Sequence, residues 1–179
     1  PEAEAALLTA LKTSSGQETL NLVDSLAARR SSQAVPAIAK LLDEPDLAAK
    51  GMALDALGRI GGEQAASVLM AARPKLPPEL KVRGAAALLR CAEGLAASGN
   101  KRQAAPILEK LTAPDEASFI RIAAFVARVQ ALGDQGAALV SSALAGNDPV
   151  LQAAAFRALR ASGNAGLAQR AAEGLDRLP

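Results

Sequence analysis

Apolar and polar positions alternate along this chain with the period of packed helices. In residues 51–61 the large apolar side chains fall on one side of a helix with 3.6 residues per turn, namely Met52, Leu54, Leu57 and Ile60. Similar patterns return along the whole chain, which is rich in alanine and leucine, the strongest helix formers. The pattern therefore predicts helices throughout.

A ten-residue stretch that begins with glutamine occurs four times. Its copies begin at Gln33, Gln64, Gln103 and Gln135, so they are separated by 31, 39 and 32 residues. Each copy follows another helical pattern, and a period of this length is typical of a helix–turn–helix repeat. Each unit is therefore predicted to contain a first helix, a tight turn and a second helix.

Short turn signals separate the predicted helices. Within a unit, glycine stands where a left-handed residue would end the first helix, at 61–62, 98–100, 133–134 and 163–164. Between units, Asp148 is expected to cap the following helix, with Pro149 at its first position. The acidic group Asp43, Glu44 and Asp46 would suit a hard cation, but a capping turn is the favoured interpretation.

The predicted fold is all-α, an α-solenoid of about five stacked helical hairpins with roughly eleven helices. We treat residues 1–179 as a single repeat domain, in which the third unit has a longer first helix over about 80–97. This unit resembles a tetratricopeptide hairpin in the spacing of Leu89, Ala92, Gly94, Ala97 and Gly99 before Ala104. Neither end has the polar face that usually closes a repeat array, so we expect a fragment of a longer protein. A lone helix at 2–13 precedes units at 17–44, 47–73, 79–112, 117–145 and 150–176.

The stretch ALDALGRIGGEQAASVLMAA at 53–72, with weaker copies at 22–42, 123–144 and 153–175, resembles HEAT repeats. The similarity is to the short bacterial repeats described as lyase-type. This resemblance implies a right-handed superhelix, with the first helices on the convex side and the second helices on the concave side. It also implies binding to other proteins, although a solenoid fold by itself does not identify a function.

Composition narrows the chemistry. The chain has no histidine, which removes the commonest general base and metal ligand, and its single cysteine excludes a disulfide within the chain. HEAT-like DNA glycosylases use Trp or other aromatic residues and HEAT-type hydroxylases use His, whereas this chain has three Phe, no Trp, no Tyr and no His. We therefore expect no enzyme, no cofactor and no metal, with Cys91 buried and inert in a helix.

Charge does not indicate a nucleic-acid partner. Twenty Lys and Arg stand against eighteen Asp and Glu, and the basic positions between 73 and 90 have no stacking aromatic residues. The S-x-x-K spelling at 98–101 lies in a turn without partner motifs and is attributed to chance. No signal segment and no apolar run of membrane-spanning length occurs in the given chain, so we expect a soluble protein.

Arginine recurs near the end of each first helix, at Arg29, Arg59, Arg90, Arg128 and Arg160. One interpretation is structural, because a cation is favoured near a helix C-terminus and can pair with an adjacent acid. The other is a ladder that binds an acidic or phosphorylated segment. The second helices are expected to line a groove with polar residues, among them Lys40, Ser67, Glu109, Lys110, Ser141 and Ser142.

The hypothesis from sequence is a non-enzymatic scaffold that presents an extended surface for protein–protein interaction. A structural spacer within a multidomain protein, or an accessory lyase-like domain of an enzyme, remains an alternative. The partner would be a protein or peptide, with no nucleic acid and no membrane, and the chain is expected to be a monomer. The candidate partner-binding residues are Arg59, Arg90, Arg128, Arg160, Lys40 and Lys110.

Overall fold

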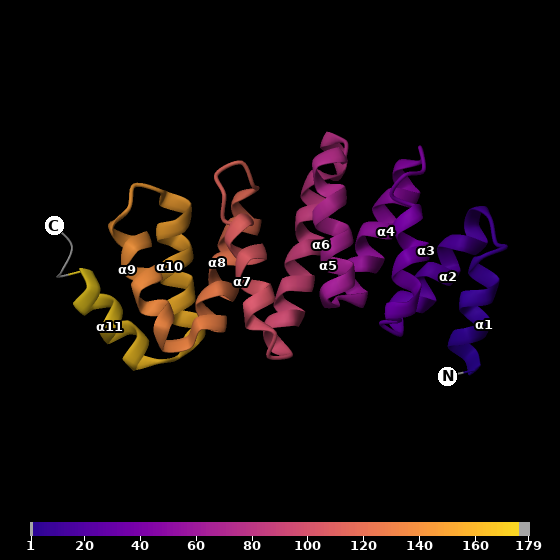
Figure 1. The fold of residues 1–179 in the computed structure, drawn as a ribbon. Helices are drawn as coiled ribbons and strands as arrows, with labels where there is room; N and C mark the ends of the chain where they lie inside the picture. Colours follow the sequence, from indigo (N-terminus) through magenta and orange to yellow (C-terminus); the bar gives the residue numbers. More distant parts are fainter. Residues whose placement is uncertain (1, 176–179) are drawn as a thin grey trace. The chain divides into compact units, whose positions relative to one another are not determined.

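The computed structural model describes residues 2–175, and all regular elements in this range are helices (Figure 1). The prediction of an all-α repeat fold with about eleven helices is confirmed over these residues. Three short 3-10 turns lie at Ser32–Ala34, Arg73–Lys75 and Gly133–Gly136 (η1 to η3). The α-helices are α1 (Glu2–Leu11), α2 (Gly16–Ala28), α3 (Val35–Lys40), α4 (Leu47–Ile60), α5 (Gly62–Ala72), α6 (Pro78–Ala97), α7 (Lys101–Lys110), α8 (Ser118–Leu132), α9 (Ala137–Ala145), α10 (Pro149–Ser162) and α11 (Ala165–Leu175).

The helices follow the predicted hairpins closely. The five predicted hairpins are the helix pairs α2–α3, α4–α5, α6–α7, α8–α9 and α10–α11, and α1 is the lone helix that precedes them. The predicted end of the fifth unit at residue 176 lies outside the described residues. The described chain forms two compact units, each of several hairpins, which we call the first unit (up to Leu95) and the second unit (from Ala96). The handedness of a superhelix and the single repeat domain stay predictions.

The predicted turn chemistry is present at both kinds of junction. Gly61 has φ +70° and separates α4 from α5, a conformation that an L side chain would strain. Asp46 caps α4 by accepting a hydrogen bond from the Ala48 amide at 2.9 Å, so the capping interpretation of this acid is confirmed. Asp148 likewise accepts from the amide of Val150, at 3.0 Å, in the first turn of α10.

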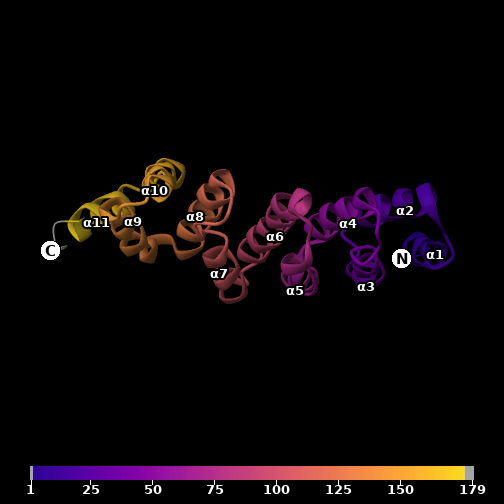
Figure 2. The same cartoon turned by 90° about the horizontal axis from the view of Figure 1, so that it is seen from above.

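In the first unit the first helices of successive repeats pack side by side. Helix α2 packs on α4, and Figure 2 shows α2, α4 and α6 in one row and α3 and α5 in another. Helix α4 meets α6 at Gly58, where an added Cβ would lie 2.9 Å from the Cα of Ala87. Such a close approach requires small residues, which accounts for glycine and alanine at this crossing.

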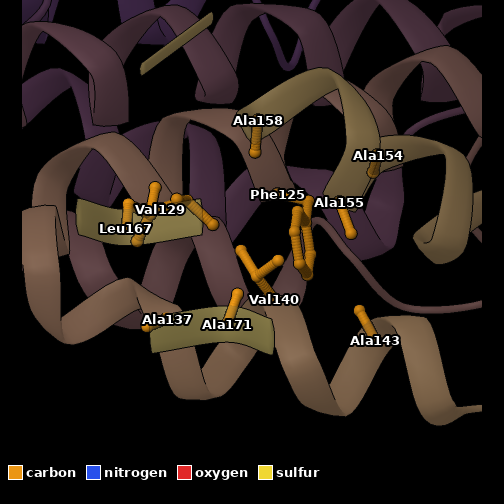
Figure 3. Packing of buried hydrophobic residues seen from close by; sticks show 10 residues of the cluster. All are labelled: Phe125, Val129, Ala137, Val140, Ala143, Ala154, Ala155, Ala158, Leu167 and Ala171. Atoms are coloured by element: carbon orange, nitrogen blue, oxygen red, sulfur yellow. The ribbon is translucent and has the colours of Figure 1, made fainter. Parts of the chain in front are cut away.

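The core of the second unit combines one aromatic ring with many small side chains. Helix α8 packs on α10, and α9 packs on α11. Phe125 is 2% exposed and points into a cluster with Val140 and three alanines of α10 (Figure 3). The fold therefore leaves the opposite faces of α8 and α10 to the surface. The alanines are Ala154, Ala155 and Ala158.

Candidate interaction surface

Two of the candidate arginines are already paired inside the first unit. Arg59 of α4 donates to Asp24 of α2 at 2.6 Å, and Arg90 of α6 donates to Asp55 of α4 at 3.2 Å. Each pair joins a first helix to the first helix of the preceding repeat. Because these side chains are 38–64% exposed, each pair contributes at most about 1 kcal/mol to stability.

Asp55 accepts hydrogen bonds from a second arginine as well. Arg83, which precedes Arg90 by two turns on α6, reaches Asp55 through its Nε at 3.0 Å and its Nη2 at 2.5 Å. The hydrogen bond to Asp55 raises the pKa of Arg83 above its ordinary value, against the opposing effect of burial. One carboxylate thus serves two guanidinium groups, and it ties α6 to α4.

In the second unit the candidate arginines differ from each other. Arg128 of α8 donates to Glu109 of α7 at 2.9 Å, which places it beside the second helix of the preceding repeat. Arg160 lies exposed in the last turn of α10, and Arg29, in the first unit, lies exposed at the end of α2. The structure therefore pairs Arg59, Arg90 and Arg128 with acids within the fold and leaves Arg160 on the surface.

The candidate lysines lie at the last residues of two second helices. Lys40 ends α3 and Lys110 ends α7, and both side chains are exposed. A cation is favoured at this end of a helix. Lys40 also lines a hollow of about 570 Å³, together with Leu20 of α2 and Leu41.

The predicted polar groove on the second helices needs one correction. Ser141 is 4% exposed, and its hydroxyl donates to the carbonyl oxygen of Ala137 at 2.7 Å. A Cβ added to Gly174 of α11 would lie only 2.4 Å from the Oγ of Ser141. Ser141 is therefore part of the contact between α9 and α11, and the expectation that it faces an open groove is wrong. The adjacent Ser142 is exposed.

Arg121 of α8 has the most buried charged side chain among residues 2–175, and the predictions from the sequence did not include it. It is 6% exposed, donates from Nε to the carbonyl oxygen of Thr112 at 3.0 Å, and is paired through Nη2 with Asp148. The Arg121 hydrogen bond is the main reason why the pKa of Asp148 lies below its usual range. A signal was present, because Arg121 is the one charged residue in the apolar run SFIRIAAFVA at 118–127.

Two of the three phenylalanines lie on the surface. Phe119 of α8 is 60% exposed and Phe156 of α10 is 62% exposed, on two helices that pack against each other. The contacts predicted from the sequence lie on the second helices and along the arginine series, whereas these rings stand on first helices. The buried stripe of α10 contains Ala154, Ala155 and Ala158, and Phe156 falls outside it.

The single thiol is shielded. Cys91 is fully buried in α6, and its sulfur lies 3.5 Å from the carbonyl oxygen of Leu57. Burial raises the pKa of Cys91 to about 11, although the charge of Arg90 opposes the shift. The thiol is therefore protonated at neutral pH, in agreement with the prediction of a buried, inert cysteine.

Within residues 2–175, no group of three or more His, Cys, Asp or Glu side chains is arranged to hold a metal ion. None of the helices in this part of the chain combines the length and apolar character that crossing a membrane requires.

Comparison with known proteins supports the family resemblance. Residues 4–90 match the family model described as HEAT repeats, so this part of the chain is similar to that family. No curated protein matches the chain. Among solved structures, it is similar to a protein described as "Crystal Structure of Engineered Protein", a Northeast Structural Genomics Consortium target. That protein is 17% identical, with a TM-score of 0.48, over 98% of this chain and 96% of that chain.

Proposed function

We propose that the protein is a non-enzymatic scaffold whose helical repeats present a surface to a protein partner. The observation that carries this proposal is the exposure of Phe119 and Phe156 on the packed helices α8 and α10. Leaving a phenylalanine in water forgoes about 1.5–3 kcal/mol of burial, which a partner can recover by covering it. Aromatic residues are enriched at protein interfaces for this reason.

The spacer alternative has its own supporting observation. Three of the candidate arginines, Arg59, Arg90 and Arg128, pair with acids of the same chain. Their recurrence is therefore explained by the stacking of repeats, without a ligand. A spacer tolerates changes at exposed positions as long as the helices still stack, whereas a scaffold loses its partner when a few surface side chains change.

Parallel capture from a lysate of the source cells, with mass spectrometry of the retained proteins, tests the scaffold. The full chain is compared with a variant carrying Phe119→Ser and Phe156→Ser. The matched control carries Leu47→Ser and Val82→Ser, two exposed aliphatic residues of the first unit, each 46% exposed. Circular dichroism checks that all three proteins keep their helices.

The scaffold predicts a protein that is retained by the unchanged chain and the control but lost from the phenylalanine variant. A third variant with Lys40→Glu, Lys110→Glu and Arg160→Glu tests the exposed candidate cations in the same way. If the unchanged chain retains nothing, the scaffold is refuted and the spacer is favoured. If every variant retains the same proteins, neither the exposed rings nor these cations bind a partner.

A further inference from the structure

A hollow of about 570 Å³ opens in the second unit between the start of α7 and the end of α8. Its apolar part consists of Ala105 of α7 with Ala131 and Leu132 of α8. Leu132 is 38% exposed, so this apolar surface is accessible to solvent. The hollow is large enough for one or two side chains of a bound segment.

Two cations, Lys101 and Arg102, line the same hollow. Both are exposed, and among residues 2–175 neither is paired with a carboxylate. They occupy the first turn of α7, where the helix dipole disfavours a positive charge. Lys101 and Arg102 therefore do not serve the helix that carries them.

Asp134 is the acidic residue in the lining of the hollow, and its negative charge is balanced by a cation that does not line the hollow. Arg170 of α11 contacts its carboxylate at 2.5 Å, and the Asn164 amide donates to it at 2.8 Å. These hydrogen bonds, the one from Arg170 first, hold the pKa of Asp134 below its usual range. The carboxylate is therefore engaged away from Lys101 and Arg102, and the charge that the hollow offers to a ligand is positive.

We propose that this hollow binds an acidic segment of a partner protein. A carboxylate of the segment lies against Lys101 and Arg102, and a neighbouring aliphatic side chain covers Ala105, Ala131 and Leu132. The arginine supplies a planar pair of donors that matches a carboxylate. Two cations would supply too few phosphate contacts for nucleic acid. The inference rests on the proposed scaffold function and specifies the chemistry of its partner.

Selection from a library of displayed random peptides, with the full chain as bait, tests this site. The most enriched peptide is then synthesised with a fluorescent label, and its Kd is measured by anisotropy at low and high salt. The site variant carries Lys101→Glu and Arg102→Glu. These changes place acids in the first turn of α7, where the dipole favours them, so the variant is expected to fold.

A charge-matched control carries Lys75→Glu and Lys81→Glu, two exposed lysines of the first unit. A second site variant, Leu132→Ser, tests the apolar part of the hollow. We expect enriched peptides with Asp or Glu next to an aliphatic residue. The Kd of these peptides should rise at least about tenfold in the Lys101/Arg102 variant and less than about twofold in the control. For the unchanged chain, the Kd should be higher at high salt than at low salt.

Three outcomes would overturn the inference. The first is a set of selected peptides that lacks acids, the second is equally tight binding to the Lys101/Arg102 variant and the unchanged chain, and the third is a selection that enriches no peptide. If the lysate capture still retains a partner through the phenylalanines, the scaffold stands and only the acidic-segment site is lost. If the unchanged chain also retains nothing in the lysate capture, the scaffold is lost as well.

Discussion

Replacing Gly58 by alanine tests whether the contact between α4 and α6 is set by backbone atoms. The added Cβ would lie 2.9 Å from the Cα of Ala87, 3.0 Å from the Nε of Arg90 and 3.1 Å from the Cβ of Ala87. The first and third neighbours belong to the backbone and to a side chain with no freedom to rotate away. The two helices must therefore move apart to accept the methyl group.

Two opposing effects determine the change in unfolding free energy. Overpacking a closely packed contact costs about 1–3 kcal/mol. Alanine in place of a helical glycine gains about 1 kcal/mol, because glycine loses more backbone entropy on folding. We therefore expect Gly58→Ala to destabilise the protein by up to about 2 kcal/mol, measured by urea unfolding with circular dichroism.

Gly94 provides the matched control, because it is an exposed helical glycine of α6 with no atom within 4 Å of an added Cβ. Gly94→Ala should stabilise the protein by about 0.5–1 kcal/mol. The difference between the two variants removes the helix propensity and leaves the clash, about 1–3 kcal/mol. Equal stability of the two variants, within about 0.5 kcal/mol, would refute a backbone-limited contact at Gly58.

Three further predictions concern charged groups and the thiol. Asp148→Asn keeps a cap acceptor but removes the charge facing Arg121. Because the pKa of Asp148 is lowered in the folded state, its stabilisation is present above the unfolded pKa and is lost as pH falls through the folded pKa. The variant should therefore be less stable than the unchanged chain at neutral pH, with the gap closing in acid; urea unfolding that shows a pH-independent gap would contradict the ion pair. Cys91, with its pKa raised to about 11, should react with Ellman's reagent in mildly alkaline buffer on the order of a hundredfold more slowly than a free cysteine. Equal rates in the folded and urea-unfolded chain would show that the thiol is accessible. A double-mutant cycle on Arg59 and Asp24 should give a coupling of about 1 kcal/mol or less, since both side chains are exposed; a larger coupling would show that the pair is shielded from water.

The helices and their turns could be predicted because the signals are local. The period of apolar residues marks each helix. Gly61 and Asp148 act on backbone within a few residues of themselves. A repeat also contains several copies of each signal, so the clear hairpin pattern at 47–73 indicates the weaker copies elsewhere in the chain. The lone cysteine followed the same logic, since it stands on the apolar face of a helical run.

The surface could not be predicted to the same extent because it depends on contacts between distant segments. Arg121 is buried by Thr112 and by Asp148, the latter 27 residues away. Ser141 is covered by Gly174 of a later helix. The exposure of Phe156 could have been predicted from the sequence, because the spacing of the alanines in α10 places it off the buried face. Phe125, by contrast, shares a buried face with Val129.

The arrangement around Arg121 has a mechanical consequence. Its guanidinium group links the carbonyl oxygen of Thr112, beyond the end of α7, to Asp148 at the first turn of α10, and its backbone belongs to α8. A force that separates α8 from α10 must expose this nearly dry cation to water, whereas the exposed pair of Arg59 and Asp24 exchanges its partners for water at little cost. The contacts of Arg121 would therefore resist tension along the second unit, because they connect three helices through one buried side chain.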